Sequence, residues 1–226
     1  MKKINIKGVI IESEDKWIYD YFKMESTSPK DVSKAIDEAN GDDLEVEINS
    51  GGGSVFAGSE IYTALKSYSG NVTVKIVGLA ASAASVIAMA GKKVTMSPTA
   101  QLMIHNVSSW QSGDYRDMEH MADVLKNAND TIANAYRLKS GMSQSDLLKL
   151  MDKESWFTAQ KALELKLIDE IMFESIKLVA SHGGLLPPEV IEKVRNTIKN
   201  PQNEAVFLIQ ENAKAKLNLL KLGGLI

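Results

Sequence analysis

Apolar and polar residues follow two different periods along the first hundred residues of the chain. Several runs are rich in β-branched residues or alternate between apolar and polar positions, which is typical of strands. The runs predicted as strands are residues 4–11, 44–50, 71–78, 92–97 and 101–106. Apolar residues at helical spacing separate the earlier runs, at 32–39 and 56–68. Strands that alternate with helices predict an α/β fold with parallel strands.

Start and stop signals locate the helices. Ser28 followed by Pro29 is typical of the start of a helix. Residues 114–138 form one long polar segment of helical character, and Gly141 is a stop signal after it. Ser143 or Ser145 is expected to cap the next helix, and Thr158 to cap a further one over AQKALELKL.

The composition of the chain changes after about residue 173. SHGGLLPPEV is a Gly- and Pro-rich joint, and an amphipathic tail rich in Asn and Lys follows it. We therefore predict a main domain over residues 1–175 and a C-terminal extension, helical or flexible, over residues 176–226.

Composition narrows the class of protein. The 226 residues carry a formal net charge of −3 at pH 7, and 44% are hydrophobic, so no basic surface for nucleic acid or anionic lipid is expected. The absence of cysteine excludes disulfides and thiolate metal sites. The N-terminal segment lacks the features of a signal peptide, and no apolar run is long enough to span a membrane. We expect a cytoplasmic protein with no cofactor and no metal.

Three short segments suggest chemistry. INSGGGSVFAG joins a strand end to a glycine turn, whose N–H groups can stabilise an anion. GLAASAAS presents Ser82 where a strand gives way to a helix, and QLMIHN presents His105 at the end of a short strand. A rigid serine, a histidine that takes its proton and amides that stabilise an oxyanion are what acyl transfer needs. Each segment alone also fits a structural role, as a buried small-residue helix or a core histidine.

The chain resembles a known family in four segments, which occur in the same order and at similar spacing. INSGGGSVFAGSEIYTAL, GLAASAASVIAMAG, MSPTAQLMIHN and SWFTAQKALELKLIDEI are similar to the ClpP family of serine peptidases. The resemblance is strongest to the ClpP-like head maturation (prohead) proteases of tailed phages and prophages, and runs from about residue 4 to residue 171. It implies the ClpP/crotonase-like fold, a repeated ββα spiral, and hydrolysis of peptide bonds by a Ser-His-acid triad.

The resemblance assigns roles to individual residues. The family nucleophile falls on Ser82, and the general base falls on His105. The oxyanion donors fall on the backbone N–H groups of Gly52 and Ala83. Ser85, three residues after the nucleophile, is then a small residue that packs inside the following helix.

The acid of the triad is where the chain departs from ClpP, which has an aspartate before its helix cap. Aligning that segment on SWFTA puts Glu154 at the position, and we prefer it, with Asp152 as the alternative. If the segment is a strand, the two side chains lie on the same face and either reaches the imidazole. Both acids also fit a simpler role, favouring the N-terminus of the next helix.

The resemblance implies a serine endopeptidase that processes capsid or scaffold proteins during phage head maturation, in a bacterial host or within the procapsid. Alternatives are a crotonase-fold acyl-CoA enzyme, against which the Ser-His pair argues, and a catalytically inactive assembly ring. A ClpP fed by an ATPase is disfavoured, because the first strand begins almost at the N-terminus.

The segment 114–138 resembles the handle helix through which two ClpP rings stack. Its apolar stripe would be poorly covered in a monomer, which predicts a ring-shaped homo-oligomer. The stripe comprises Met118, Met121, Val124, Leu125, Ala128, Ile132 and Ala135. His120 and His182 match no motif and are expected at the surface.

Overall fold

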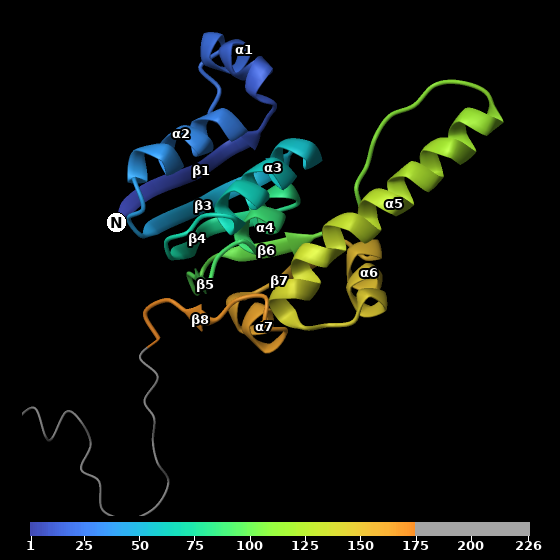
Figure 1. Cartoon of the computed structure of the whole chain (residues 1–226). Helices are drawn as coiled ribbons and strands as arrows, with labels where there is room; N and C mark the ends of the chain where they lie inside the picture. The colour runs from blue at the N-terminus through green and yellow to red at the C-terminus, as the bar shows by residue number, and fades with distance from the viewer. Residues whose placement is uncertain (175–226) are drawn as a thin grey trace, which may run out of the picture. The chain divides into compact units, whose positions relative to one another are not determined.

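The computed structural model describes residues 1–174, so the predicted C-terminal extension and His182 lie outside the described residues. Helices and strands alternate along the chain (Figure 1). The strands are β1 (Lys2–Ile10), β2 (Ser26–Thr27), β3 (Leu44–Gly53), β4 (Val72–Ala81), β5 (Lys93–Met96), β6 (Gln101–Ile104), β7 (Ser155–Phe157) and β8 (Glu170–Ile171). The helices are the short 3-10 helix η1 (Ser13–Asp15), α1 (Lys16–Tyr21), α2 (Pro29–Ala39), α3 (Val55–Lys66), α4 (Ala83–Ala88), α5 (Tyr115–Ser140), α6 (Gln144–Asp152) and α7 (Ala159–Glu164).

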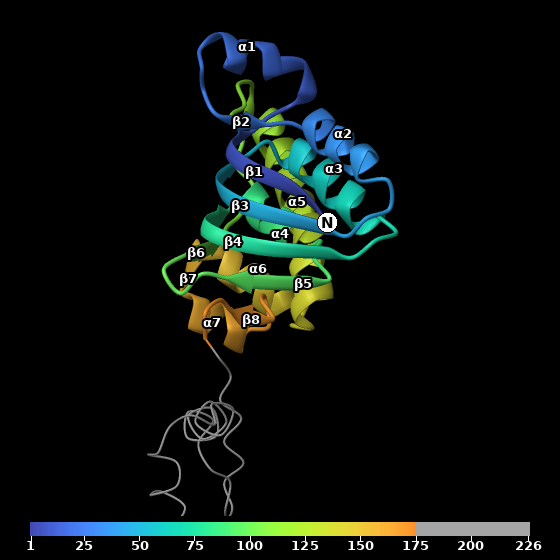
Figure 2. The same ribbon diagram turned by 90° about the vertical axis from the view of Figure 1, so that its left-hand side faces the viewer.

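The strands form one eight-stranded sheet. Its main path runs in the order β2-β1-β3-β4-β5-β8 (Figure 2), and β6 and β7 lie off this path. Neighbours along this path are parallel, as predicted. The far half of β4 leaves this path and pairs with β6 instead. β6 in turn pairs with β7, and this pair is antiparallel, unlike the all-parallel sheet that the alternation of elements predicts.

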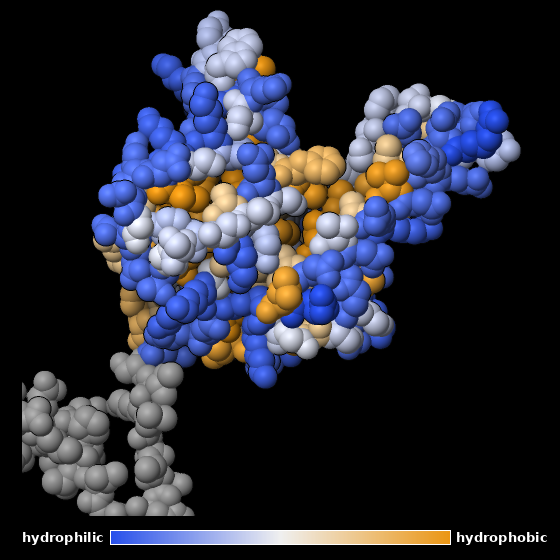
Figure 3. Space-filling view, in the orientation of Figure 1, coloured by the Kyte–Doolittle hydropathy of each residue, from blue (hydrophilic) through white to orange (hydrophobic). Residues whose placement is uncertain are grey.

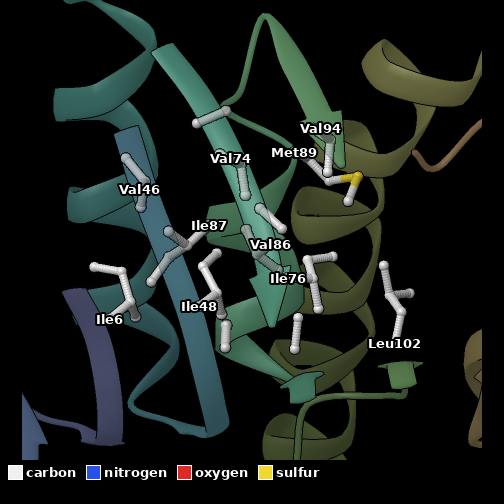
Figure 4. Close-up of a cluster of buried hydrophobic side chains, with 14 of the residues drawn as sticks. Ile6, Val46, Ile48, Val74, Ile76, Val86, Ile87, Met89, Val94 and Leu102 are labelled. Atoms are coloured by element: carbon white, nitrogen blue, oxygen red, sulfur yellow. The ribbon is translucent and has the colours of Figure 1, made fainter. Parts of the chain in front are cut away.

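Buried residues at alternate positions explain why β3 and β4 lie in the centre of the sheet. The side chains of Ile6 in β1, Ile48 in β3 and Ile76 in β4 are fully buried with Ile87 of α4 (Figure 4). Burying one such side chain stabilises a protein by about 1.5–3 kcal/mol. Every residue of α4 is buried, so the helix that follows Ser82 is held on all sides.

Capping residues mark the ends of the helices. The hydroxyl of Ser28 accepts from the N–H of Asp31, whose carboxylate accepts from the N–H of Ser28, and the two contacts form a capping box at α2. Asp114 caps α5, which ends at Gly141 with a left-handed backbone. Of the two serines considered for α6, Ser143 is the cap.

One helix forms without a signal in the sequence, and one expectation about local structure is wrong. No helix was predicted between β1 and β2, because Trp17 and Tyr21 of α1 are exposed and leave no buried stripe for the sequence to display. Asp152 and Glu154 do not share a strand. Asp152 is the last residue of α6, and Glu154 precedes β7 with a φ of 48°, a left-handed conformation that interrupts any extended run.

Helix α5 extends away from the sheet (Figure 1). Its first residues are exposed, whereas Ala133, Ala135 and Tyr136 near its other end are buried against the core. Within residues 1–174, no helix combines the length and the apolar character needed to cross a membrane.

Candidate active site

The site lies where β4 and β6 end side by side. Their parallel register pairs Ala81 with Met103, and the N–H of Ser82 donates to the carbonyl of Met103 at 3.1 Å. The residues that follow the two strands therefore emerge at the same edge of the sheet, where the carboxyl ends of parallel strands commonly form binding sites. Those residues are Ser82 and, after Ile104, His105.

Ser82 occupies a sharp turn between β4 and α4. Its φ of 54° and ψ of −126° lie in a region that a residue with a side chain rarely adopts. The turn directs the hydroxyl toward His105, whose Nε2 lies 2.7 Å from Ser82 Oγ. The structure thus brings the predicted nucleophile and the predicted base into hydrogen-bonding contact.

The glycine turn lies against the same serine. A Cβ on Gly52 would lie 2.7 Å from Ser82 Cβ, and Gly52 also has a φ of 97°, so this close approach requires glycine. The N–H of Gly52 donates to the Ser50 hydroxyl at 3.1 Å, and that hydroxyl donates to the Gly8 carbonyl. Ala83 begins α4, where backbone N–H groups have no acceptor within the helix.

Neither predicted acid makes a hydrogen bond to the imidazole within the described residues. β6 and β7 pair Ile104 with Ser155, and His105 and Glu154 are the residues next to this last pair of the antiparallel ladder. The Glu154 carboxylate, however, accepts from the Trp156 ring N–H at 3.2 Å.

Asp152 is engaged elsewhere. Its carboxylate accepts from the side-chain N–H of Asn106 at 2.8 Å. The other side-chain atom of Asn106, Oδ1, is buried and has no partner among the described residues. The geometry therefore joins Ser82 to His105 and leaves both acids in other contacts.

A cavity opens beside the serine and the histidine. Apolar side chains gather around a hollow between the body of the molecule and the base of α5 (Figure 3). The cavity is lined by Gly53, Val55, Ser82, Ala83, Val86, His105, Val107, Ser108, Ile132 and Tyr136. Polar and apolar groups contribute about equally to this lining, so the site can accept an uncharged group next to the Ser82 hydroxyl.

Two residues of this region were missed as parts of the site. Tyr136 comes from the base of α5, and Ser50 lies two residues before Gly52. A buried tyrosine needs a partner for its hydroxyl, but nothing in the sequence showed that Tyr136 is buried. Ser85 is buried as predicted, but its hydroxyl contacts Tyr136. In residues 1–174 no group of three or more acidic, histidine or cysteine side chains is arranged to hold a metal ion.

Comparison with known proteins identifies relatives. The Clp protease family model matches residues 32–175. The ATP-dependent Clp protease proteolytic subunit of Bacteroides fragilis is 35% identical over 136 residues, 59% of this chain and 66% of the relative. The subunit of the same name from Deinococcus radiodurans is 31% identical over 133 residues, 58% of this chain and 65% of the relative. The match spans just under two thirds of the length of these relatives.

A solved structure shares the fold. A ClpP1 mutant from Listeria monocytogenes superposes with a TM-score of 0.62 at 24% identity, and the similarity covers 76% of this chain and 91% of that chain. This likeness concerns the fold, and it confirms the predicted ClpP-like α/β architecture.

Proposed function

This chain belongs to the Clp protease family, and we propose that it is a serine endopeptidase with Ser82 as nucleophile and His105 as general base. The observation that carries the proposal is the 2.7 Å contact between Ser82 Oγ and His105 Nε2 at the ends of two paired strands. A serine is a weak nucleophile until an adjacent base takes its proton, and this contact supplies that base.

The residues support a two-step hydrolysis. His105 takes the proton of Ser82 as Oγ attacks the peptide carbonyl carbon, and the carbonyl electron pair moves onto oxygen. The N–H of Ala83 stabilises that oxyanion, together with the N–H of Gly52 once this N–H leaves the Ser50 hydroxyl. The C–N bond then breaks, and His105 gives its proton to the departing amine. His105 then takes a proton from water, which attacks the acyl carbon, and His105 returns this proton to Ser82 Oγ as the C–Oγ bond breaks and the acid product leaves.

We assign the third position of the triad to Glu154. It follows the last β6–β7 pair beside His105, and a glutamate side chain is long enough to leave the Trp156 ring N–H and turn toward the imidazole. Asp152 is the weaker candidate, because its carboxylate is held by Asn106.

The substrate we propose is a capsid or scaffold protein of a phage head. The support is the resemblance of the chain's four motifs, taken together, to head maturation proteases. The cavity beside Ser82 leaves room for a group of the substrate next to the nucleophile.

We further propose that the protein assembles into a ring through α5. Met118 of α5 is 41% exposed and Val124 is 44% exposed, and Met121 and Leu125 of the same stripe are half-buried. A helix that projects with such residues uncovered favours contact with another copy. Ile132 of the predicted stripe instead lines the cavity and packs against the core.

A fluorophosphonate probe should modify Ser82 and leave Ser85 unmodified, because Ser82 contacts His105 in an open cavity whereas Ser85 is buried. Peptide mapping by mass spectrometry reads the modified residue. Ser82→Ala should abolish both labelling and peptide hydrolysis. A wild-type protein that is not labelled would favour the inactive assembly ring or a crotonase-type acyl-CoA enzyme, which needs no reactive serine here.

Glu154→Gln should lower kcat by about 10²–10⁴-fold, as loss of the orienting acid does in other triads. Asp152→Asn is the matched control, an identical change of charge two residues away, and should cost less. Steady-state peptidase assays give the ranking. The reverse order would move the acid to Asp152.

Met118→Lys combined with Leu125→Lys should reduce the mass of the particle, since the two positions lie seven residues apart on one face of α5. The pair His120→Lys and Asn127→Lys adds the same charges on the opposite, exposed face and should leave the mass unchanged. Analytical ultracentrifugation measures both. Equal masses for all three proteins would refute assembly through this face.

The purified protein should cut the capsid or scaffold protein encoded beside it, and Ser82→Ala should not. Sequencing the neighbouring genes identifies those candidates, and gel electrophoresis with N-terminal sequencing locates the cut. A neighbourhood without portal or capsid genes would contradict the proposed role in head maturation while leaving the endopeptidase proposal standing.

A further inference from the structure

Two buried hydroxyls connect α4 to α5 behind the nucleophile. Ser85 is 0% exposed and Tyr136 is 1% exposed. Ser85 Oγ donates to the backbone carbonyl of Ser82 at 2.6 Å and lies 2.8 Å from the Tyr136 hydroxyl oxygen. A chain of hydrogen bonds therefore runs from the base of α5 to the backbone of the turn that carries Ser82.

The direction of this chain follows from the number of protons available. A carbonyl oxygen accepts only, so the single proton of the Ser85 hydroxyl is used on Ser82. Ser85 must then accept from Tyr136, whose phenol is the donor. Burial raises the pKa of Tyr136 above its ordinary value, although the Ser85 contact partly opposes the shift. The phenol therefore keeps its proton at neutral pH.

The Ser82 carbonyl belongs to the same peptide unit as the N–H of Ala83, one of the two oxyanion donors in the proposed function. Resonance links the two ends of a peptide, so hydrogen bonds accepted by its oxygen strengthen its N–H as a donor and fix its plane. We infer that Ser85 and Tyr136 are positioning residues, which orient and polarise the Ser82–Ala83 peptide for the oxyanion. This inference rests on the proposed function.

The Ser82–Ala83 peptide lies in a strained turn, and the two hydroxyls can influence its orientation. Ser82 has a strained backbone, and its carbonyl also accepts the N–H of Ser85 at 2.9 Å and that of Val86 at 3.3 Å. The Ser85 hydroxyl adds the shortest of the three contacts and the only one that Tyr136 of α5 reaches. Removing this hydroxyl keeps the two N–H contacts but weakens the polarisation of the peptide and the control of its orientation.

Variants Ser85→Ala and Tyr136→Phe remove one hydroxyl each, and Thr95→Val is the control. Thr95 is another buried hydroxyl bound to a strand carbonyl, on β5 and away from the cavity. Five quantities are measured: the rate of fluorophosphonate labelling of Ser82, kcat and KM on a fluorogenic tri-leucine amide, and the affinities of a tri-leucine aldehyde and of the matching alcohol. The aldehyde forms a tetrahedral adduct with Ser82 that places an oxygen on the oxyanion donors, whereas the alcohol forms none.

Losing an oxyanion donor costs 10²–10³-fold in kcat, and here the donor is weakened rather than lost, so Ser85→Ala should lower kcat by about 10-fold. KM and the affinity for the alcohol should stay within about 2-fold, while the affinity for the aldehyde and the labelling rate fall in parallel with kcat. Tyr136→Phe should act in the same direction, and the double variant should be no worse than Ser85→Ala. Thr95→Val should match the wild type.

Equal weakening of aldehyde and alcohol, or labelling and kcat within 2-fold of the wild type, would overturn the inference and leave the endopeptidase proposal intact. Tyr136→Phe keeps the ring and its packing, so it decides the matter if Ser85→Ala does not fold. A wild-type Ser82 that reacts with no fluorophosphonate would overturn the proposed function, and this inference with it.

Discussion

The parallel pairing of β6 with the far half of β4 is the constraint on which the rest of the site depends. β4 pairs with β5 through Ile76 and with β6 from Leu79 onward, so one strand serves two neighbours in succession. This switch brings the end of β6 to the end of β4. Without this pairing, Ser82 and His105, which are 23 residues apart in sequence, would not be brought into contact.

Small residues make the approach of the other elements possible. A Cβ on Gly52 would collide with the Ser82 side chain, and one on Gly58 of α3 would lie 2.9 Å from the Ala83 side chain. The buried helix α4 then fixes the turn from beneath. Two further small residues, Gly53 and Ala83, line the cavity beside the serine.

Much of this arrangement could be predicted from the sequence, because it is encoded locally. Alternating apolar residues mark β3 and β4, and the Ser28–Pro29 signal marks α2. The strand-end positions of Ser82 and His105 then follow from the order of the elements. The antiparallel β7 was missed because it is only three residues long.

Contacts between distant segments could not be predicted in the same way. The surroundings of Glu154 depend on a left-handed residue in a turn, which no periodic pattern encodes. The contact of Ser85 with Tyr136 joins residues 51 positions apart, and it appears only once α5 is packed on α4. Reactive residues are therefore easier to identify from the sequence than the residues that position them.

The central claim is that Ser82 and His105 act as one unit, and a double-mutant cycle on peptide hydrolysis tests it most directly. Steady-state kcat is measured for the wild type, Ser82→Ala, His105→Ala and the double variant, with particle mass and thermal unfolding as checks on folding. The account predicts that each single variant falls to the same residual rate and that the double variant is no slower, because members of a triad lose activity together. Losses that multiply in the double variant, or hydrolysis that survives Ser82→Ala, would contradict it.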